Sequence, residues 1–141
     1  MGIIQVQGAL TAGPLNGTVP SAGNGGVLNV ALALKGGVGS KPYAIASGLM
    51  QYQLQTADAT TYQTLPGIGS APGVLKGDTI YFFATAPILL RLTFDNGGVD
   101  IVSVIPVDGL FLLEVNANKW LKLVEAAGTA GIEYLVTSPS Q

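Results

Sequence analysis

The chain is 141 residues long, carries a net charge of −2, and contains neither cysteine nor histidine. These two absences remove disulfides, the usual zinc ligands and the commonest general base. Only 10% of the residues are charged, against about 25% in an ordinary soluble domain, which predicts that other protein subunits cover part of the surface.

Membranes and nucleic acids are not expected partners. The longest apolar run, residues 79–90, is interrupted by Thr85 and Pro87 and falls short of the ~20 residues of a spanning helix. The six basic residues are scattered and give no electrostatic footprint for nucleic acid. The first residues lack the basic and apolar regions of a secretory signal.

Glycine and proline recur every few residues through residues 1–25, with apolar residues between them. This pattern predicts an extended N-terminal arm that reaches a neighbouring subunit through Ile3, Ile4, Val6 and Leu10. A first strand followed by a loop of the same domain is the alternative. We therefore divide the chain into an arm, residues 1–25, and a domain, residues 26–141.

Two strands are predicted next, at residues 27–34 and 44–55, separated by a turn at residues 36–42. In the second run Met50, Tyr52 and Leu54 alternate with glutamines, which is typical of a strand with one buried face and one face exposed to solvent. The polar connection that follows, residues 56–77, has room for one short strand at residues 62–65.

The second half carries the strongest strand signals. Residues 79–84 are apolar at every position after the first, which predicts a strand buried on both faces. Residues 88–94 alternate, and Asp95-Asn96-Gly97-Gly98 supplies a hairpin turn from which residues 99–107 return antiparallel. Asp108-Gly109 predicts another reversal before a strand at residues 110–115.

The chain ends in a strand at residues 132–137, with Ile132, Tyr134 and Val136 on one face and Glu133 on the other. Residues 118–127 could form a turn or two of helix. About eight to ten short strands in one domain indicate an all-β fold, a jelly-roll-like antiparallel β-sandwich.

No motif indicates catalysis, and we expect no catalytic residue, no cofactor and no metal. The glycine-rich residues 36–41 resemble a phosphate loop only superficially, because Ser40 precedes Lys41 instead of following it. Asp95 and Asp100 bracket a hairpin without the ligand spacing of a calcium loop. A glycosidase would need two converging carboxylates, and the candidates are Asp108, Glu114, Glu125 and Glu133.

Three aromatic residues, Trp120, Tyr43 and Tyr62, lie near predicted turns. Exposed aromatic rings at such places serve either a sugar platform or a protein interface. We favour the interface, so Trp120 joins Ile3, Ile4, Val6 and Leu10 as a residue expected to contact a partner.

The stretch LLRLTFDNGGVDIVSVIPVDGLFLLEV from Leu89, with KLVEAAGTAGIEYLVTSPS from Lys122, resembles the cement, or decoration, proteins of tailed-bacteriophage capsids, those of podophages in particular. The resemblance implies a jelly-roll subunit, paired as a homodimer or else a trimer. It would be made in the host cytoplasm and sit on the outer surface of the virion, bridging adjacent major capsid protein subunits. A glycan-binding module of a phage tail, fibre or spike is the alternative.

Overall fold

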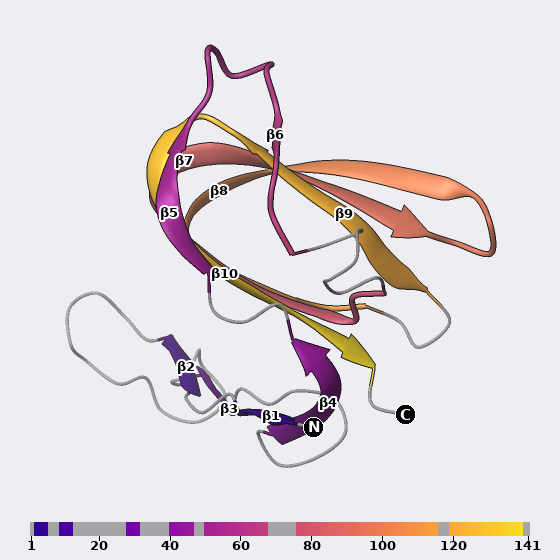
Figure 1. Cartoon of the computed structure of the whole chain (residues 1–141). Coiled ribbons are helices and arrows are strands. Elements are labelled where there is room, and N and C mark those ends of the chain that lie inside the picture. Colours follow the sequence, from indigo (N-terminus) through magenta and orange to yellow (C-terminus); the bar gives the residue numbers. More distant parts are fainter. Residues whose placement is uncertain are drawn as a thin grey trace. The chain divides into compact units, whose positions relative to one another are not determined.

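The computed structural model describes residues 50–67, 76–115 and 119–138 with their side chains, and Pro139 and four earlier strands by their backbone. Every regular element in this described part is a strand, so the prediction of an all-β chain is confirmed (Figure 1). The earlier strands are β1 (Gly2–Gln5), β2 (Ala9–Ala12), β3 (Leu28–Ala31) and β4 (Ser40–Ala46).

The chain divides into two compact units, residues 3–41 and residues 1–2 together with 42–141. In the first unit β2 and β3 pair antiparallel, from Ala9 opposite Ala31 to Ala12 opposite Leu28. The predicted division into an arm and a domain stays a prediction, because side chains before residue 50 lie outside the described part.

The second unit contains one antiparallel sheet. Its later strands are β5 (Met50–Gln55), β6 (Gln63–Thr64), β7 (Thr79–Asp95), β8 (Asp100–Glu114), β9 (Trp120–Ala127) and β10 (Thr129–Pro139). The order is β4–β10–β7–β9–β6, with β5 also paired to β10 and β8 also paired to β7. The sheet is curled, and the long strands β7 and β8 bend together (Figure 1).

The curl arises where β7 changes its partner. Residues 79–84 of β7 pair with β10, residues 89–95 pair with β9, and β8 accompanies both halves on the other edge. Since Ala84 lies opposite Gly109 and Ile88 opposite Val107, three residues of β7 (85–87) face one residue of β8, Asp108. Such a bulge bends a strand and increases its twist.

This bulge corrects one prediction. Asp108-Gly109 does not reverse the chain, and residues 110–115 do not begin a separate strand, because β8 continues through the bend. Gly109 takes a φ of 92°, a conformation that side chains rarely adopt, and so absorbs the change in direction. Gly109 does mark a change in direction, but β7 bends at the same level, so the pairing of β7 with β8 continues past it.

The predicted hairpin after β7 is confirmed, with its tip one residue further on than the Asn-Gly pair suggests. Asn96 donates its backbone N–H to the Val99 carbonyl at 2.9 Å. Gly97 and Gly98, with φ of 69° and 90°, form the two-residue loop. Two successive positive φ angles match the twist of the flanking strands.

Elements were also predicted for three other segments, and the structure bears on each of them. The short strand expected within residues 62–65 is present as β6. The suggested helical turn in residues 118–127 is wrong where the structure describes it, because Trp120–Ala127 is β9 and pairs with β7. The turn expected at residues 36–42 is wrong at its end, since β4 begins at Ser40; the following Pro42 favours an extended Lys41.

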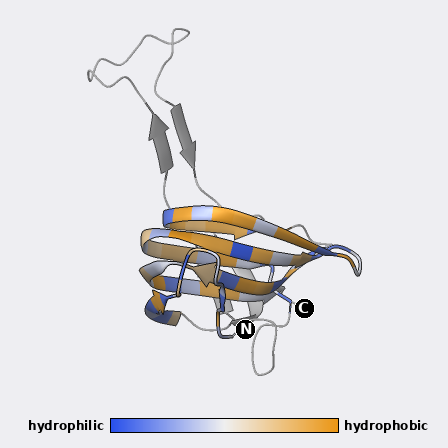
Figure 2. Ribbon diagram, turned by 90° about the horizontal axis from the view of Figure 1, so that it is seen from above, coloured by the Kyte–Doolittle hydropathy of each residue, from blue (hydrophilic) through white to orange (hydrophobic). Residues whose placement is uncertain are grey.

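The core lies on one face of the curled sheet. Its members come from β5, β7, β8, β9 and β10 and from Leu65, which follows β6, and hydrophobic residues run along the long strands (Figure 2). The fully buried large side chains include Leu54, Leu65, Ile80, Phe82, Leu90, Leu92, Leu121, Val124, Tyr134 and Val136. Phe82 stacks on Tyr134 with ring centroids 6.3 Å apart, and the Tyr134 hydroxyl donates to the Pro66 carbonyl at 2.7 Å.

The alternation predicted for β5 and β10 is confirmed, since Leu54, Ile132, Tyr134 and Val136 are buried. Burial of residues 79–84 on both faces is wrong: Phe83 is 39% exposed and Tyr81 is half-buried. Both project from the outer face of the sheet, which no described element covers.

Candidate interaction surface

The outer edge of the sheet is formed by β8, which pairs with β7 and with no other strand of the described part. Large apolar side chains are exposed along it and at the adjoining turn. They are Val99, Ile101, Val102, Val104, Leu110 and Leu112, and Leu110 is 67% exposed. An exposed strand edge with apolar side chains favours pairing with another chain.

The hydrogen-bonding direction of β8 follows from its two ends. Because Asn96 and Val99 form a hydrogen-bonded pair, alternate residues of the antiparallel ladder point their backbone groups away from β7, among them Val102 and Val104. At the far end the Val115 N–H donates to the Asp78 carbonyl at 2.8 Å. By the same alternation the backbone N–H and C=O groups of Leu110 and Leu112 point away from β7.

Two segments of this edge, residues 101–105 and 110–113, contain no charged side chain. Edge strands are usually protected by charges, prolines or bulges. In β8 these devices lie at the bend, with Pro106 and Asp108, and at the two ends of the strand, with Asp100 and Glu114. Pro106 is at an outward position and costs no ladder hydrogen bond. On either side of the bend the edge is therefore open to strand addition. We call residues 101–105 and 110–113 the β8 edge segments.

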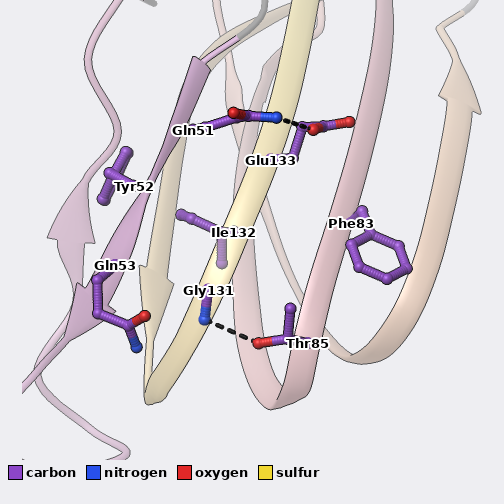
Figure 3. A pocket seen from close by; sticks show the side chains of 8 residues that line it. All are labelled: Gln51, Tyr52, Gln53, Phe83, Thr85, Gly131, Ile132 and Glu133. Atoms are coloured by element: carbon purple, nitrogen blue, oxygen red, sulfur yellow. Dashed lines mark hydrogen bonds between the residues drawn. The ribbon is translucent and has the colours of Figure 1, made fainter.

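A hollow of about 400 Å³ lies on the outer face over β5, β10 and β7 (Figure 3). Its lining residues are Gln51, Tyr52, Gln53, Phe83, Thr85, Gly131, Ile132 and Glu133. The Gln51 amide donates to Glu133 Oε2, and the Tyr81 hydroxyl donates to Glu133 Oε1 at 3.0 Å. Burial, the hydrogen bond to Glu133 and its negative charge raise the pKa of Tyr81.

Of the residues predicted to contact a partner, Trp120 is the one whose side chain the structure describes. Trp120 is the first residue of β9 and is half-buried. The Lys76 ammonium lies over its ring, 4.4 Å from the ring centroid. Ile3 and Ile4 belong to β1 and Leu10 to β2, described by backbone alone, and Val6 lies outside the described residues. Their role in an interface stays a prediction.

Two of the four candidate carboxylates, Glu133 and Glu114, do not converge. Glu133 lies beside Phe83 and Glu114 beside Thr79, four positions or about 13 Å apart along β7, on its opposite sides. Arg91 binds Glu125 through two hydrogen bonds, at 2.6 and 2.8 Å. Glu133 and Glu114 are therefore further apart than the ~5–10 Å of a glycosidase pair.

The two aspartates at the hairpin act in the local structure. Asp95 accepts the Gly98 N–H at 2.9 Å, and Asp100 accepts a hydrogen bond from the Lys122 ammonium at 2.7 Å. Within residues 50–67, 76–115 and 119–138, no three acidic side chains gather in a way that could hold a metal ion.

Sequence reasoning missed both the edge segments and the hollow. The sequence does contain a signal for the edge segments, because residues 101–105 are apolar at both odd and even positions, as in Ile101, Val102, Val104 and Ile105. A strand with apolar residues on both faces at a sheet edge indicates a second contact. The hollow depends on residues of three strands, and no single run contains its pattern.

The fold and surface together define an antiparallel all-β protein with an exposed apolar edge strand. Comparison with protein-family models, curated proteins and solved structures gives no match. The described residues contain no helix with the length and hydrophobicity needed to cross a membrane.

Proposed function

We propose that this chain is a structural virion protein that decorates and cements the outside of a bacteriophage capsid by bridging adjacent major capsid protein subunits. The exposed apolar edge of β8 is the observation that carries the proposal. In this proposal the curled sheet is a jelly-roll-like sandwich, two copies pair through β8, and the N-terminal arm contacts the shell.

The physical basis is contact area. Burial of apolar surface contributes roughly 25 cal/mol per Å², and an added strand supplies backbone hydrogen bonds as well. A decoration protein adds binding free energy that exists only in the assembled shell, so it stabilises the shell against opening. Repetition over many copies allows each single contact to be weak.

A second copy fits the β8 edge segments because they are uncharged. Two antiparallel copies related by a two-fold axis can place Val102 of one copy opposite Val104 of the other, which sets Asp100 opposite Pro106 and juxtaposes no like charges. The apolar side chains at these positions are then removed from water. A homodimer through β8 therefore satisfies both the backbone and the side chains of this edge.

Lysine substitutions on the edge test the dimer. We expect the double variant Val104→Lys, Leu110→Lys to be monomeric by native mass spectrometry at concentrations where the unsubstituted protein is dimeric. Both positions are more than half exposed, so the fold should persist while the new charges repel across the two-fold axis. Gln55→Lys, an exposed position on β5, is the control and should remain dimeric. A monomeric unsubstituted protein, or a dimeric double variant, would contradict the β8 interface.

Removal of residues 2–12 tests the arm. We expect the shortened chain to keep its strand-rich circular dichroism spectrum and to lose binding to shells assembled from the major capsid protein encoded in the same genome. Decoration is measured by co-sedimentation with empty shells, and Gln5→Ala, a polar position of the same segment, is the control. Unchanged occupancy of the shell by the shortened chain would defeat the arm assignment, and failure of the full chain to bind would defeat the proposed function.

A further inference from the structure

We propose that the hollow over Gly131 binds a neutral pyranose ring of a saccharide, with Phe83 as the stacking surface and Gln51, Gln53 and Glu133 as hydrogen-bonding partners. This site goes beyond the proposed decoration of a shell, because binding a sugar needs neither the arm nor the second copy.

Gly131 lies in the interior of β10, opposite Gln53 of β5. It is not among the glycines with positive φ, so its backbone conformation does not require glycine. A Cβ there would lie 3.2 Å from Thr85 Oγ1, while Thr85 Oγ1 accepts the Gly131 N–H at 2.9 Å. Glycine weakens a strand interior and often marks a place where a ligand approaches the backbone.

The polar side of the hollow is held in place before any ligand arrives. Gln51 and Glu133 point toward one another across β5 and β10 (Figure 3). The Glu133 carboxylate accepts from Gln51 and Tyr81, and a carboxylate has about four acceptor positions, so it can also accept from sugar hydroxyls. Gln53 lines the hollow with an amide that both donates and accepts.

The apolar side is Phe83, which lies on β7 next to Glu133 in the register and is 39% exposed. A pyranose presents hydroxyl groups around its edge and C–H groups on its faces, so it matches a site with one aromatic ring and several planar polar groups. Small-molecule sites combine apolar lining with a few placed polar groups in volumes of about 300–1,000 Å³, and this hollow has about 400 Å³.

The charge of the site selects the class of sugar. Glu133 is the one ionised side chain among the residues that line the hollow. Its hydrogen-bond donors, Gln51 and Tyr81, are neutral and leave its negative charge in place. An acidic sugar would bring a second carboxylate beside Glu133, and like charges at close range repel. The ligand class is therefore a neutral hexose or its N-acetyl derivative.

Saturation-transfer NMR and titration calorimetry with methyl glucoside, galactoside, mannoside and N-acetylglucosaminide test the proposal on the full chain. We expect at least one of them to bind, and Phe83→Ala and Gln53→Ala each to weaken that binding by about tenfold or more. Gln55→Ala is the matched control, because Gln55 projects from the same exposed face of β5 outside the hollow. Its affinity should equal that of the unsubstituted protein.

A glycan array extends the test to longer saccharides with the same four proteins. Absence of binding to every neutral saccharide, or equal binding by the Phe83→Ala, Gln53→Ala and Gln55→Ala variants, would overturn the site. Shell co-sedimentation of the Phe83→Ala and Gln53→Ala variants separates the two proposals. Retained decoration with lost sugar binding supports both, whereas sugar binding by a chain that never decorates a shell leaves the site standing and removes the proposed function.

Discussion

Replacement of Phe82 by alanine is expected to lower the free energy of unfolding by about 3–5 kcal/mol, the usual cost of emptying a buried phenylalanine site. Phe82 is completely buried and stacks on Tyr134, so its removal leaves a cavity between β7 and β10. Phe83 is the matched control. It is the next residue of the same strand, points to the other face and is 39% exposed, and its replacement by alanine should cost less than about 1 kcal/mol.

Urea unfolding followed by circular dichroism measures both variants. A domain of ordinary stability unfolds at a cost of about 5–15 kcal/mol, so Phe82→Ala should shift the midpoint strongly or leave the chain partly unfolded. Protein concentration must be equal in all samples, because a dimer gains apparent stability by mass action. Equal midpoints for Phe82→Ala and Phe83→Ala would show that the two faces of β7 are wrongly assigned.

Replacement of Gly128 by alanine is expected to cost about 3 kcal/mol or more. Gly128 joins β9 to β10 with a φ of 134°, and an added Cβ would lie 3.0 Å from Ile88 Cγ2 and 3.4 Å from Ile88 Cα. Backbone strain of about 1–3 kcal/mol and overpacking of about 1–3 kcal/mol both act at this position. The turn cannot easily move away, since the Gly128 N–H donates to Thr56 Oγ1 at 2.7 Å.

Gly98→Ala separates these two costs. Gly98 also has a positive φ, 90°, but nothing lies within 4 Å of an added Cβ, so this variant carries the strain without the crowding. Differential scanning calorimetry should show a midpoint for Gly128→Ala about 10 °C below that of the unsubstituted protein, at about 3 °C per kcal/mol, and a smaller loss for Gly98→Ala. Equal losses would mean that the contact with Ile88 relaxes at no cost.

The strands themselves were largely predictable from the sequence, because alternation in residues 50–55 and 132–137 and the glycine pair of the hairpin are local signals. The curl was not predictable in the same way. A glycine at position 109 indicates a change of direction, but whether the chain reverses or bends depends on the strand beside it. Here β7 bulges at the same level, and that is a property of the pair.

The candidate surfaces were harder to predict for a related reason. Residues 79–84 are apolar throughout, and burial on both faces was a sound expectation from that run alone. Exposure of Phe83 depends on what covers the outer face, which the run does not encode. The hollow needs Gln53, Gly131 and Thr85 in register across three strands, so it becomes visible only with the pairing.

The change of partner along β7 has a mechanical consequence. A single covalent strand runs through both halves of the sheet, hydrogen-bonded to β10 in one half and to β9 in the other, with β8 beside it throughout. Tension applied at either end of β7 is transmitted along its backbone from the half paired with β10 to the half paired with β9. The two halves of the sheet are therefore joined mechanically by one continuous strand.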